Sequence, residues 1–244
     1  MTKNEFFALE RQLIDDGHDA DLDSFAVIKE RLKSKSPLEP DEFARQAIYV
    51  VLAGGFSQKT AKKVHIDIMN RLVQTTQRVV IPAKAGIHCV IKTREGSRTR
   101  SATELTCCAA MDPRLRGDDE LVRLAEELFL IFHNKNKTNA IANLWANRQT
   151  YRDDYYKLSN IDDKLRYIAG LPHIGKTTAH HLARNLGENV FKRDVWIDRL
   201  LSKYGEDLLE RLERETSLPR GYIDVVLWKA CQIGLIELSV IKRE

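Results

Sequence analysis

The sequence predicts an all-α fold, and three observations support this prediction. Apolar side chains recur with the period of about 3.6 residues of an α-helix over most of the 244 residues. The breaks between these periodic segments carry turn residues, as at Asp16-Gly17 and Gly54-Gly55. No convincing strand pattern occurs outside residues 78–118, and the chain has no internal repeat with a period of roughly 20–50 residues.

Four helices are expected before residue 78. The first is amphipathic and ends at a turn over residues 16–19. The helix that starts at Pro40 has a nearly all-apolar interior, FARQAIYVVLAG, so we expect it to be a buried central helix. The glycine pair at 54–55 breaks this helix. The expected helices of this half cover residues 4–15, 22–33, 40–53 and 57–72.

Eight further helices are expected after residue 118. Pro219 lies just before the last of them, which is a usual position outside the start of a helix. The segment 151–158 is rich in tyrosine. The expected helices cover residues 120–133, 137–146, 151–158, 161–168, 176–186, 194–204, 207–216 and 221–238.

Residues 78–118 differ from the rest of the chain. The segment has no sustained helical period, holds two of the six prolines and three of the four cysteines, and has turn residues at 111–113 and 116–118. Its pieces VIPAKAGI and MDPRLRGDD resemble the translated ends of small mobile repeat elements of some bacterial genomes. The resemblance implies an in-frame insertion, which a surface loop tolerates at modest thermodynamic cost. The alternative is a basic loop that contacts DNA.

The net charge of +4 is confined to this segment. Eight of the 39 basic and four of the 35 acidic residues lie in 78–118, which leaves 31 of each elsewhere. Net basicity is therefore no evidence for a nucleic-acid partner, and such evidence must be local.

The composition is that of an ordinary globular protein, with 43% hydrophobic and 30% charged residues. No apolar run approaches the roughly 18–20 residues of a membrane span, and the start lacks a basic-then-apolar export signal. We therefore expect a cytoplasmic protein without a membrane partner, associated with the bacterial nucleoid if it binds DNA. The cysteines form no CxxC pair, which predicts free thiols and no metal site.

The run LRYIAGLPHIGKTTAHHLARNLGENVFKRDVWIDRLLSKYG carries the most specific signal. Its first half predicts a helix, a tight turn at 171–175 and a second helix that packs against the first. The first N–H groups of that second helix have no partner within it, and Gly175 lets another molecule approach closely. A helix start of this kind, with Lys176 and the hydroxyls of Thr177 and Thr178, favours phosphate binding.

The turn resembles the consensus L-P-G-[VI]-G-x-x-x-A-x-x-[LI] of the helix-hairpin-helix motif. The positions that match are Leu171, Pro172, Ile174, Gly175, Ala179 and Leu182. His173 replaces the first glycine, and its side chain in the turn weakens the expected grip on a phosphate. The resemblance implies DNA contacts at Leu171, His173, Gly175, Lys176, Thr177 and Thr178. The alternative is an ordinary corner between two helices.

An aspartate follows the turn at the distance found in the helix-hairpin-helix superfamily of DNA glycosylases, which includes endonuclease III. That family has an essential aspartate in a D-[VT]-[HW]-[IVL] run, and here Asp194 opens DVWIDR, 19 residues after Gly175. The resemblance is clear over residues 161–204 and extends loosely over 41–244. It implies a two-lobed, all-α glycosylase-like fold. It also implies that Asp194 is catalytic, because an anion stabilises the positive charge that develops on the sugar. Capping a helix is the other role expected of Asp194.

Lyase-type members of the family place a lysine two residues after the last glycine of the turn, where it forms a Schiff base with the sugar. Thr177 stands there in this sequence, and Lys176 is one residue early, a rotation of about 100° on a helix. The family's lysine does not carry over, so we predict a monofunctional enzyme in which Asp194 activates water. The alternative is a glycosylase/lyase that uses Lys176. The four-cysteine iron–sulfur loop of endonuclease III is absent, and we expect no cofactor.

An enzyme that flips a base out of a duplex must fill the vacated stack. In related folds the loop after the buried N-terminal helix often does so, which makes Phe56 or Gln58 the expected wedge; burial of Phe56 is the alternative. Four aromatic residues are candidates for the pocket that holds the flipped base: Tyr49, Trp145, Tyr151 and Tyr155. Such residues belong more often to the core, which is the alternative for each of them.

Two further groups near the motif have modest expected roles. The three histidines at positions 173, 180 and 181 lack the spacing of metal ligands, so they are expected to contact phosphate or lie on the surface. Asp198 is expected to pair with Arg199 or Lys203.

The sequence therefore predicts a base-excision repair DNA glycosylase that acts as a monomer on double-stranded DNA containing a damaged base. The alternatives are a non-catalytic helix-hairpin-helix DNA-binding protein and an all-helical protein–protein module. The expected organisation is N-terminal helices over 1–40 that pack with the C-terminal helices, a helical lobe over 41–160 interrupted by the insertion, the hairpin and Asp194 over 161–204, and C-terminal helices over 205–244.

Overall fold

The computed structural model describes the backbone of residues 1–20, 22–80 and 113–238, and the side chains of these ranges outside 76–118. Twelve α-helices and no strand occur in these ranges, which confirms the all-α prediction; Ala20 and Ser24 form an isolated bridge. The helices are α1 (Lys3–Asp15), α2 (Phe25–Ser34), α3 (Pro40–Ala53), α4 (Gln58–Val80), α5 (Pro113–Phe129), α6 (Lys135–Ala146), α7 (Arg148–Lys157), α8 (Ile161–Ala169), α9 (Lys176–Asn185), α10 (Val195–Tyr204), α11 (Leu208–Thr216) and α12 (Arg220–Gln232).

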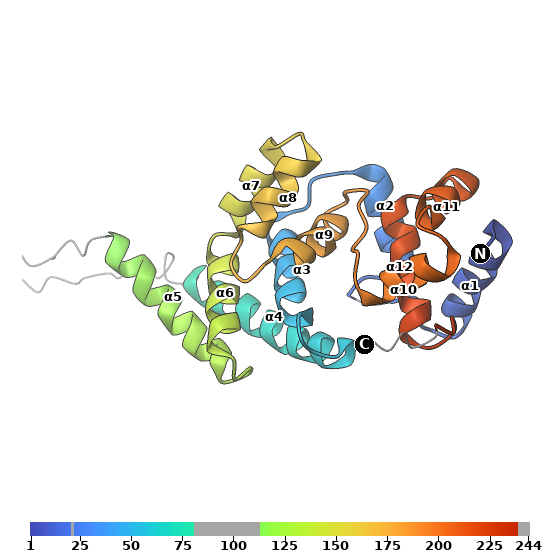
Figure 1. The fold of residues 1–244 in the computed structure, drawn as a ribbon. Helices are drawn as coiled ribbons and strands as arrows, with labels where there is room; N and C mark the ends of the chain where they lie inside the picture. The colour runs from blue at the N-terminus through green and yellow to red at the C-terminus, as the bar shows by residue number, and fades with distance from the viewer. Residues whose placement is uncertain (21, 81–112, 239–244) are drawn as a thin grey trace, which may run out of the picture.

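The helices surround two hydrophobic cores (Figure 1). The first core is formed by side chains of α3 to α9, with α3 at its centre. Nearly every residue of α3 from Phe43 to Leu52 is buried, which confirms the prediction of a buried central helix. The second core is formed by α1, α2, α10, α11 and α12.

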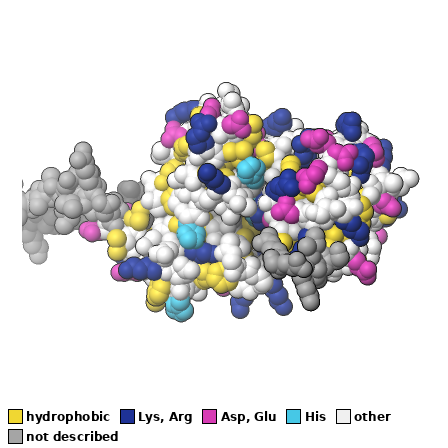
Figure 2. Space-filling model, in the orientation of Figure 1, with side chains coloured by type: hydrophobic (Ala, Val, Ile, Leu, Met, Phe, Trp, Pro, Cys, Tyr) yellow, Lys and Arg dark blue, Asp and Glu magenta, His cyan; other side chains and the backbone are white. Residues whose placement is uncertain are grey.

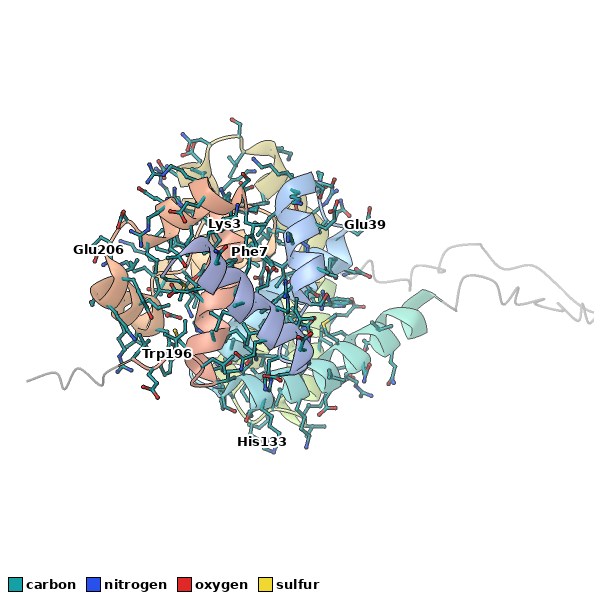
Figure 3. All side chains as sticks on the ribbon, turned by 90° about the vertical axis from the view of Figure 1, so that its right-hand side faces the viewer. Lys3, Phe7, Glu39, His133, Trp196 and Glu206 are labelled. Carbon is teal, nitrogen blue, oxygen red and sulfur yellow. The ribbon has the colours of Figure 1, made fainter. Side chains whose placement is uncertain are left out.

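The two ends of the described chain therefore meet in the second core. Helices α1 and α2 pack against α12, although more than 180 residues separate them along the chain. Figure 3 shows α1 lying across α12, with Lys3 and Phe7 on the helix nearest the viewer. The chain passes from the second core to the first at residues 35–39 and returns at residues 187–193. This return segment is the linker that leads to Asp194.

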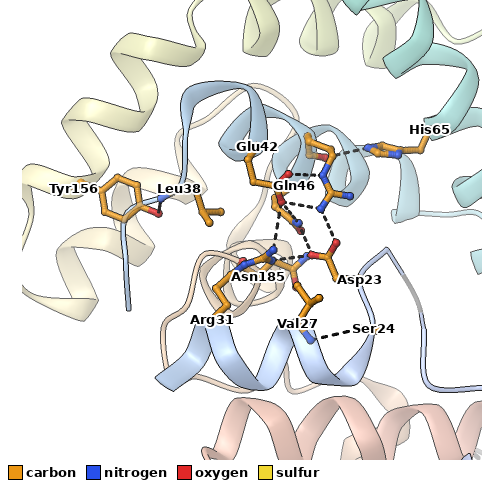
Figure 4. Close-up of polar contacts among 11 residues, drawn as sticks. Asp23, Ser24, Val27, Arg31, Leu38, Glu42, Gln46, His65, Tyr156 and Asn185 are labelled. Carbon is orange, nitrogen blue, oxygen red and sulfur yellow. Dashed lines mark hydrogen bonds and ion pairs between the residues drawn. The ribbon is translucent and has the colours of Figure 1, made fainter. Parts of the chain in front are cut away.

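A cluster of charged side chains joins α2 to α3 between the cores (Figure 4). Asp23 accepts hydrogen bonds from Arg31 at 2.8 Å and from Arg45 at 2.5 Å. Glu42 also pairs with both arginines, and the Gln46 amide donates to both carboxylates. Arg31 donates further to the carbonyl oxygen of residue 185, at the end of α9. The cluster thus ties the second core to the helix that carries the candidate phosphate site.

The two helices that flank residues 81–112 differ from their predicted limits. Helix α4 continues to Val80, and α5 begins at Pro113, whose fixed φ suits the first turn of a helix. The turn predicted at 116–118 is therefore wrong, because these residues lie in α5. The interpretation of 78–118 as an insertion rests mainly on residues outside the described ranges, as do three of the four cysteines; Cys231 is a buried free thiol. In the described ranges, no helix is both long and apolar enough to cross a membrane.

Candidate functional site

Helices α8 and α9 pack against each other through a tight turn at residues 170–175. Leu171 and Ile174 are buried in the first core, which leaves the tip of the turn outside. The N–H of Ile174 donates to the carbonyl of Leu171 at 3.1 Å, and His173 between them has a φ of 61°. A β-turn with positive φ at its third residue favours glycine there. The exposed His173 therefore occupies the position where the consensus has glycine, in a backbone conformation that glycine adopts without strain.

The start of α9 is open to solvent. Gly175 is the N-cap, with an extended backbone, and a Cβ placed on it would meet nothing within 4 Å. Its N–H donates to the hydroxyl of Thr178 at 2.9 Å, so that hydroxyl is held within the turn. Lys176 and Thr177 are exposed and directed away from the core. The structure thus brings His173, Gly175, Lys176 and Thr177 together on one exposed end of the helix. The expectation of a DNA contact is wrong for Leu171, because its side chain is buried in the core and its N–H donates to the carbonyl of Ile168.

The linker after α9 is held firmly on both sides. Gly187, at φ 98°, ends α9, and the N–H of Glu188 donates back to the carbonyl of Ala183 at 3.0 Å. The Asn189 side chain accepts from the N–H of Gly221 at 3.0 Å. A Cβ on Gly221 would lie 2.8 Å from the Val190 carbonyl oxygen, so α12 approaches the linker this closely only with glycine there. This packing fixes where the linker ends.

Asp194 lies at that end, as the N-cap of α10. Its Oδ1 accepts hydrogen bonds from the N–H groups of Trp196 at 3.0 Å and Ile197 at 3.3 Å, which confirms the predicted capping role. Its Oδ2 lies 3.1 Å from the Nζ of Lys192, and the side chain is 14% exposed. Donors on both oxygens hold the carboxylate in one orientation. The residue therefore presents an oriented carboxylate at the boundary between the two cores.

A buried charged pair lies beside Asp194 and was not predicted from the sequence. Arg184 of α9 and Asp224 of α12 form an ion pair with side chains 9% and 1% exposed, and Asp224 also accepts from the N–H of Lys192 at 3.2 Å. Burial raises the pKa of the Asp224 carboxyl, and Arg184 acts against this increase. The one signal in the sequence is that Asp224 interrupts the apolar run GYIDVVLW, where a buried acid requires a partner.

His181 is another member of this buried group. Its ring packs edge-on against Tyr49, with 6.3 Å between the ring centroids. Burial lowers the pKa of His181 well below its ordinary value, and the charges of Arg184 and Lys192 act in the same direction. The expectation of a phosphate-contacting or surface histidine is wrong at this position, because the side chain faces the interior of the fold. His180, one residue earlier, is half-buried beside the open end of α9.

A cleft of about 500 Å³ lies beside the open end of α9. Its walls are residues of α9, the linker and the start of α12: Lys176, Thr177, His180, Asn189, Val190, Phe191, Arg193 and Arg220. Arg193 pairs with Asp198 at 2.7 Å, so Asp198 has an ion-pair partner other than the two predicted. Arg220 pairs with Glu213 at 2.9 Å. Figure 2 likewise shows Lys and Arg interspersed with Asp and Glu over α11 and α12. Lys176 is therefore the cation of this cleft with no ion pair among the described side chains.

Most of the other residues predicted to contact DNA or a flipped base are engaged within the protein. The Gln58 side chain accepts from Lys229 of α12 at 2.9 Å, and its Nε2 is buried, so it is not directed outward as a wedge. Phe56 is 41% exposed and stacks edge-on with Phe132. Tyr49, Trp145 and Tyr155 are core residues, and the Tyr151 hydroxyl donates to Asn143 at 2.6 Å.

No metal site is apparent in the part of the chain that the structure describes, where no three His, Cys, Asp or Glu side chains are grouped to hold an ion. Comparisons with protein-family models, with curated proteins and with solved structures find no match to this chain.

Proposed function

We propose that the protein is a monofunctional DNA glycosylase, which hydrolyses the N-glycosidic bond of a damaged base in double-stranded DNA. In this proposal, α8, the turn and α9 are a helix-hairpin-helix, and the two cores are the two lobes of a glycosylase-like fold. The observation that carries the proposal is the fixed orientation of the Asp194 carboxylate at the boundary of the cores. The firmly held linker connects it to the open start of α9, which carries Lys176.

The open end of α9 supplies the DNA contact. The N–H groups of its first turn carry the positive end of the helix dipole, and Gly175 leaves room for a phosphate to approach them. Lys176 adds an unpaired positive charge at the same place. These groups recognise the backbone and not the bases, so they position any duplex without specifying the lesion.

Asp194 supplies the chemistry. Cleavage of the N-glycosidic bond develops positive charge on the sugar, and a fixed carboxylate stabilises this charge without having to reorient during the reaction. The carboxylate then orients the water that adds to the sugar carbon as the base leaves. Thr177 in place of the lyase lysine supports hydrolysis. The protein acts as a monomer without a cofactor in this mechanism.

A panel of duplexes with alkylated, oxidised or deaminated bases tests the proposal. The wild type is expected to release at least one free base, and Asp194→Asn to release it at least roughly 100-fold more slowly with the same Kd for the duplex. Asparagine caps a helix as well as aspartate does, so this variant keeps the fold. Asp198→Asn, one helical turn further and exposed, is the matched control and is expected to keep full activity.

The outcomes separate the alternatives. Binding without release of any base identifies a non-catalytic DNA-binding protein, a reading favoured by the His173 side chain in the turn. Strand cleavage without added alkali, lost in Lys176→Gln, identifies a lyase that uses Lys176. Absence of salt-dependent duplex binding contradicts both DNA-binding readings.

A further inference from the structure

A small, partly open cavity of about 20 Å³ lies against Asp194. It is lined by side chains from α9, the linker, the start of α10 and α12, namely His181, Arg184, Lys192, Asp194, Asp224 and Trp228. It is distinct from the open cleft beside Lys176, because the linker separates the two: Lys192 lines the cavity, and Arg193 lines the cleft.

Two buried polar atoms of the cavity wall have no hydrogen-bond partner among the described residues. They are Oδ1 of Asp224 and Nε of Arg184, on side chains that are 1% and 9% exposed. The ion pair between these residues uses only the other oxygen and Nη1. An unsatisfied buried donor or acceptor destabilises the fold, so an unpaired donor and an unpaired acceptor on two residues that line one cavity indicate a ligand that bonds to both.

The size and charge of the cavity select the ligand. A cavity needs roughly 10–15 Å³ to hold one water molecule. This cavity, of about 20 Å³, is only slightly larger. Its wall carries two basic residues, Arg184 and Lys192, two acidic residues, Asp194 and Asp224, and His181, whose pKa is lowered by burial. The balanced charge disfavours an ion of either sign, and the unpaired Nε–H donor of Arg184 further disfavours a metal cation.

We propose that one water molecule occupies this cavity and joins Asp224 and Arg184 to Asp194. The water accepts from the Nε–H of Arg184 and donates one hydrogen to Oδ1 of Asp224 and the other to the carboxylate of Asp194. Three hydrogen bonds are the usual number for a buried water. Arg184 and Asp224 are then positioning residues, which hold the Asp194 carboxylate through the water.

This arrangement matters because the other contacts of Asp194 are local. The two backbone donors belong to its own helix, and Lys192 lies two residues away on the same segment. The water instead connects the carboxylate to α9 and α12, which pack in the two cores. The role in base release rests on the proposed glycosylase function, whereas the occupancy of the cavity does not.

A high-resolution crystal structure of the full chain tests the occupancy directly. We expect one ordered water in the cavity of the wild type, within hydrogen-bond distance of Nε of Arg184 and Oδ1 of Asp224. In Arg184→Lys, which keeps the charge opposite Asp224 but has no Nε–H, the water is expected to be displaced or absent. An empty wild-type cavity, or a metal ion or a side chain in it, overturns the proposal.

Kinetics of the double variant Arg184→Met/Asp224→Leu test the positioning role. Apolar residues of similar size in place of a buried ion pair often leave stability unchanged, so this variant is expected to fold. We expect single-turnover base release to slow roughly 10- to 100-fold, with an unchanged Kd for the duplex, because Asp194 loses its fixed orientation. Asp23→Asn, a buried ion-paired carboxylate that does not line the cavity, is the matched control and is expected to keep the wild-type rate.

The two proposals fail in different ways. If the folded double variant releases base as fast as the wild type does, the positioning role is overturned and the glycosylase proposal remains intact. Absence of release by the wild type overturns the glycosylase proposal, while the crystal structure still decides whether the water is bound.

Discussion

His173 shows how a single backbone angle explains a departure from a motif. Left-handed backbone costs a residue with a side chain about 1–2 kcal/mol, and glycine escapes this cost but loses about 0.5–1 kcal/mol more chain entropy on folding. The φ of 61° therefore explains why the consensus has glycine at this position and why histidine is tolerated.

Replacing this residue by glycine is expected to stabilise the fold. His173→Gly should raise the free energy of unfolding by up to about 1 kcal/mol, the difference between relief of backbone strain and the added chain entropy. Urea unfolding at pH 7 measures the change. His180→Gly in helical backbone is the control and should lose about 1 kcal/mol. A loss at both positions would contradict a strained turn.

The buried His65 is expected to make the free energy of unfolding depend on pH. Its side chain is 3% exposed, with Nε2 at 3.1 Å from the carbonyl oxygen of Arg45, and burial lowers its pKa to about 4. The unfolded chain, with an ordinary pKa of about 6.5, binds more protons than the folded protein between pH 6.5 and pH 4. Stability is therefore complete above pH 6.5 and decreases as the pH falls towards 4. The buried His181 acts in the same direction.

A substitution at His65 separates its contribution to the pH dependence of unfolding from that of the other titrating groups. From pH 7 to pH 5 this residue is expected to remove about 2 kcal/mol of stability, at 1.36 kcal/mol per pH unit below 6.5. His65→Gln keeps a hydrogen-bond donor but does not titrate, so its unfolding free energy should fall by that much less over the same range. His18→Gln, at an exposed position, should retain the wild-type slope. Equal slopes in all three proteins would contradict the assignment.

At the scale of elements, the two ends of α9 lie in different surroundings. Its first turn is exposed and carries Lys176, while its last turn is buried and carries Arg184. Helical periodicity made the element predictable, and the LPHIG turn placed its start. Its buried end was not predictable, because Arg184 finds its partner 40 residues further along the chain.

The open end of α9 predicts a specific salt effect. Lys176→Gln should weaken duplex binding and reduce the slope of log Kobs against log salt concentration by about 1, because one phosphate contact is lost. Lys3→Gln, on α1 and away from α9, is the control and should leave the slope unchanged (Figure 1). A salt titration by fluorescence anisotropy measures both. An unchanged slope in Lys176→Gln would contradict the proposed phosphate contact at the start of α9.

The ends of the helices were less predictable than their existence, and two helices show why. Helix α2 starts at Phe25, three residues later than predicted, because the Ser24 side chain caps it. Helix α12 ends at Gln232, six residues early, where Gly234 takes a φ of 81°. The apolar residues after α12 continue the helical spacing of apolar side chains in the sequence, although the backbone is no longer helical there.

At the scale of the whole molecule, the sequence pattern makes Asp194 a candidate catalytic residue but does not predict its surroundings. The carboxylate stands in a short run at a fixed distance from a turn, which a linear pattern can detect. The cavity beside it is assembled from side chains of four segments, and no linear pattern brings Arg184, Lys192 and Asp224 together. The meeting of α1 and α2 with α12 likewise depends on packing over the full length of the chain.

Among the described residues, the contacts that join the two cores include the charged cluster around Asp23, the pair of Arg184 with Asp224, the linker, and the hydrogen bond from Lys229 to Gln58. These several connections predict that both cores unfold together even when one is weakened. In Asp23→Asn, Glu42 is the remaining carboxylate partner of the largely buried Arg31 and Arg45. The loss of one partner should lower the free energy of unfolding by about 3 kcal/mol. Asp41→Asn breaks only the exposed pair with Arg148 and should cost less than about 1 kcal/mol.

Tryptophan fluorescence reports on each core separately. Trp145 lies in the first core, and Trp196 and Trp228 pack against the second. A variant with only Trp145 and a variant without it should show coincident urea transitions, both in the wild-type background and with Asp23→Asn, where both midpoints shift to lower urea together. Coincidence is expected because Arg184 with Asp224 and the linker still connect the cores. Separate transitions in Asp23→Asn would instead identify the cluster around Asp23 as the main connection between the cores.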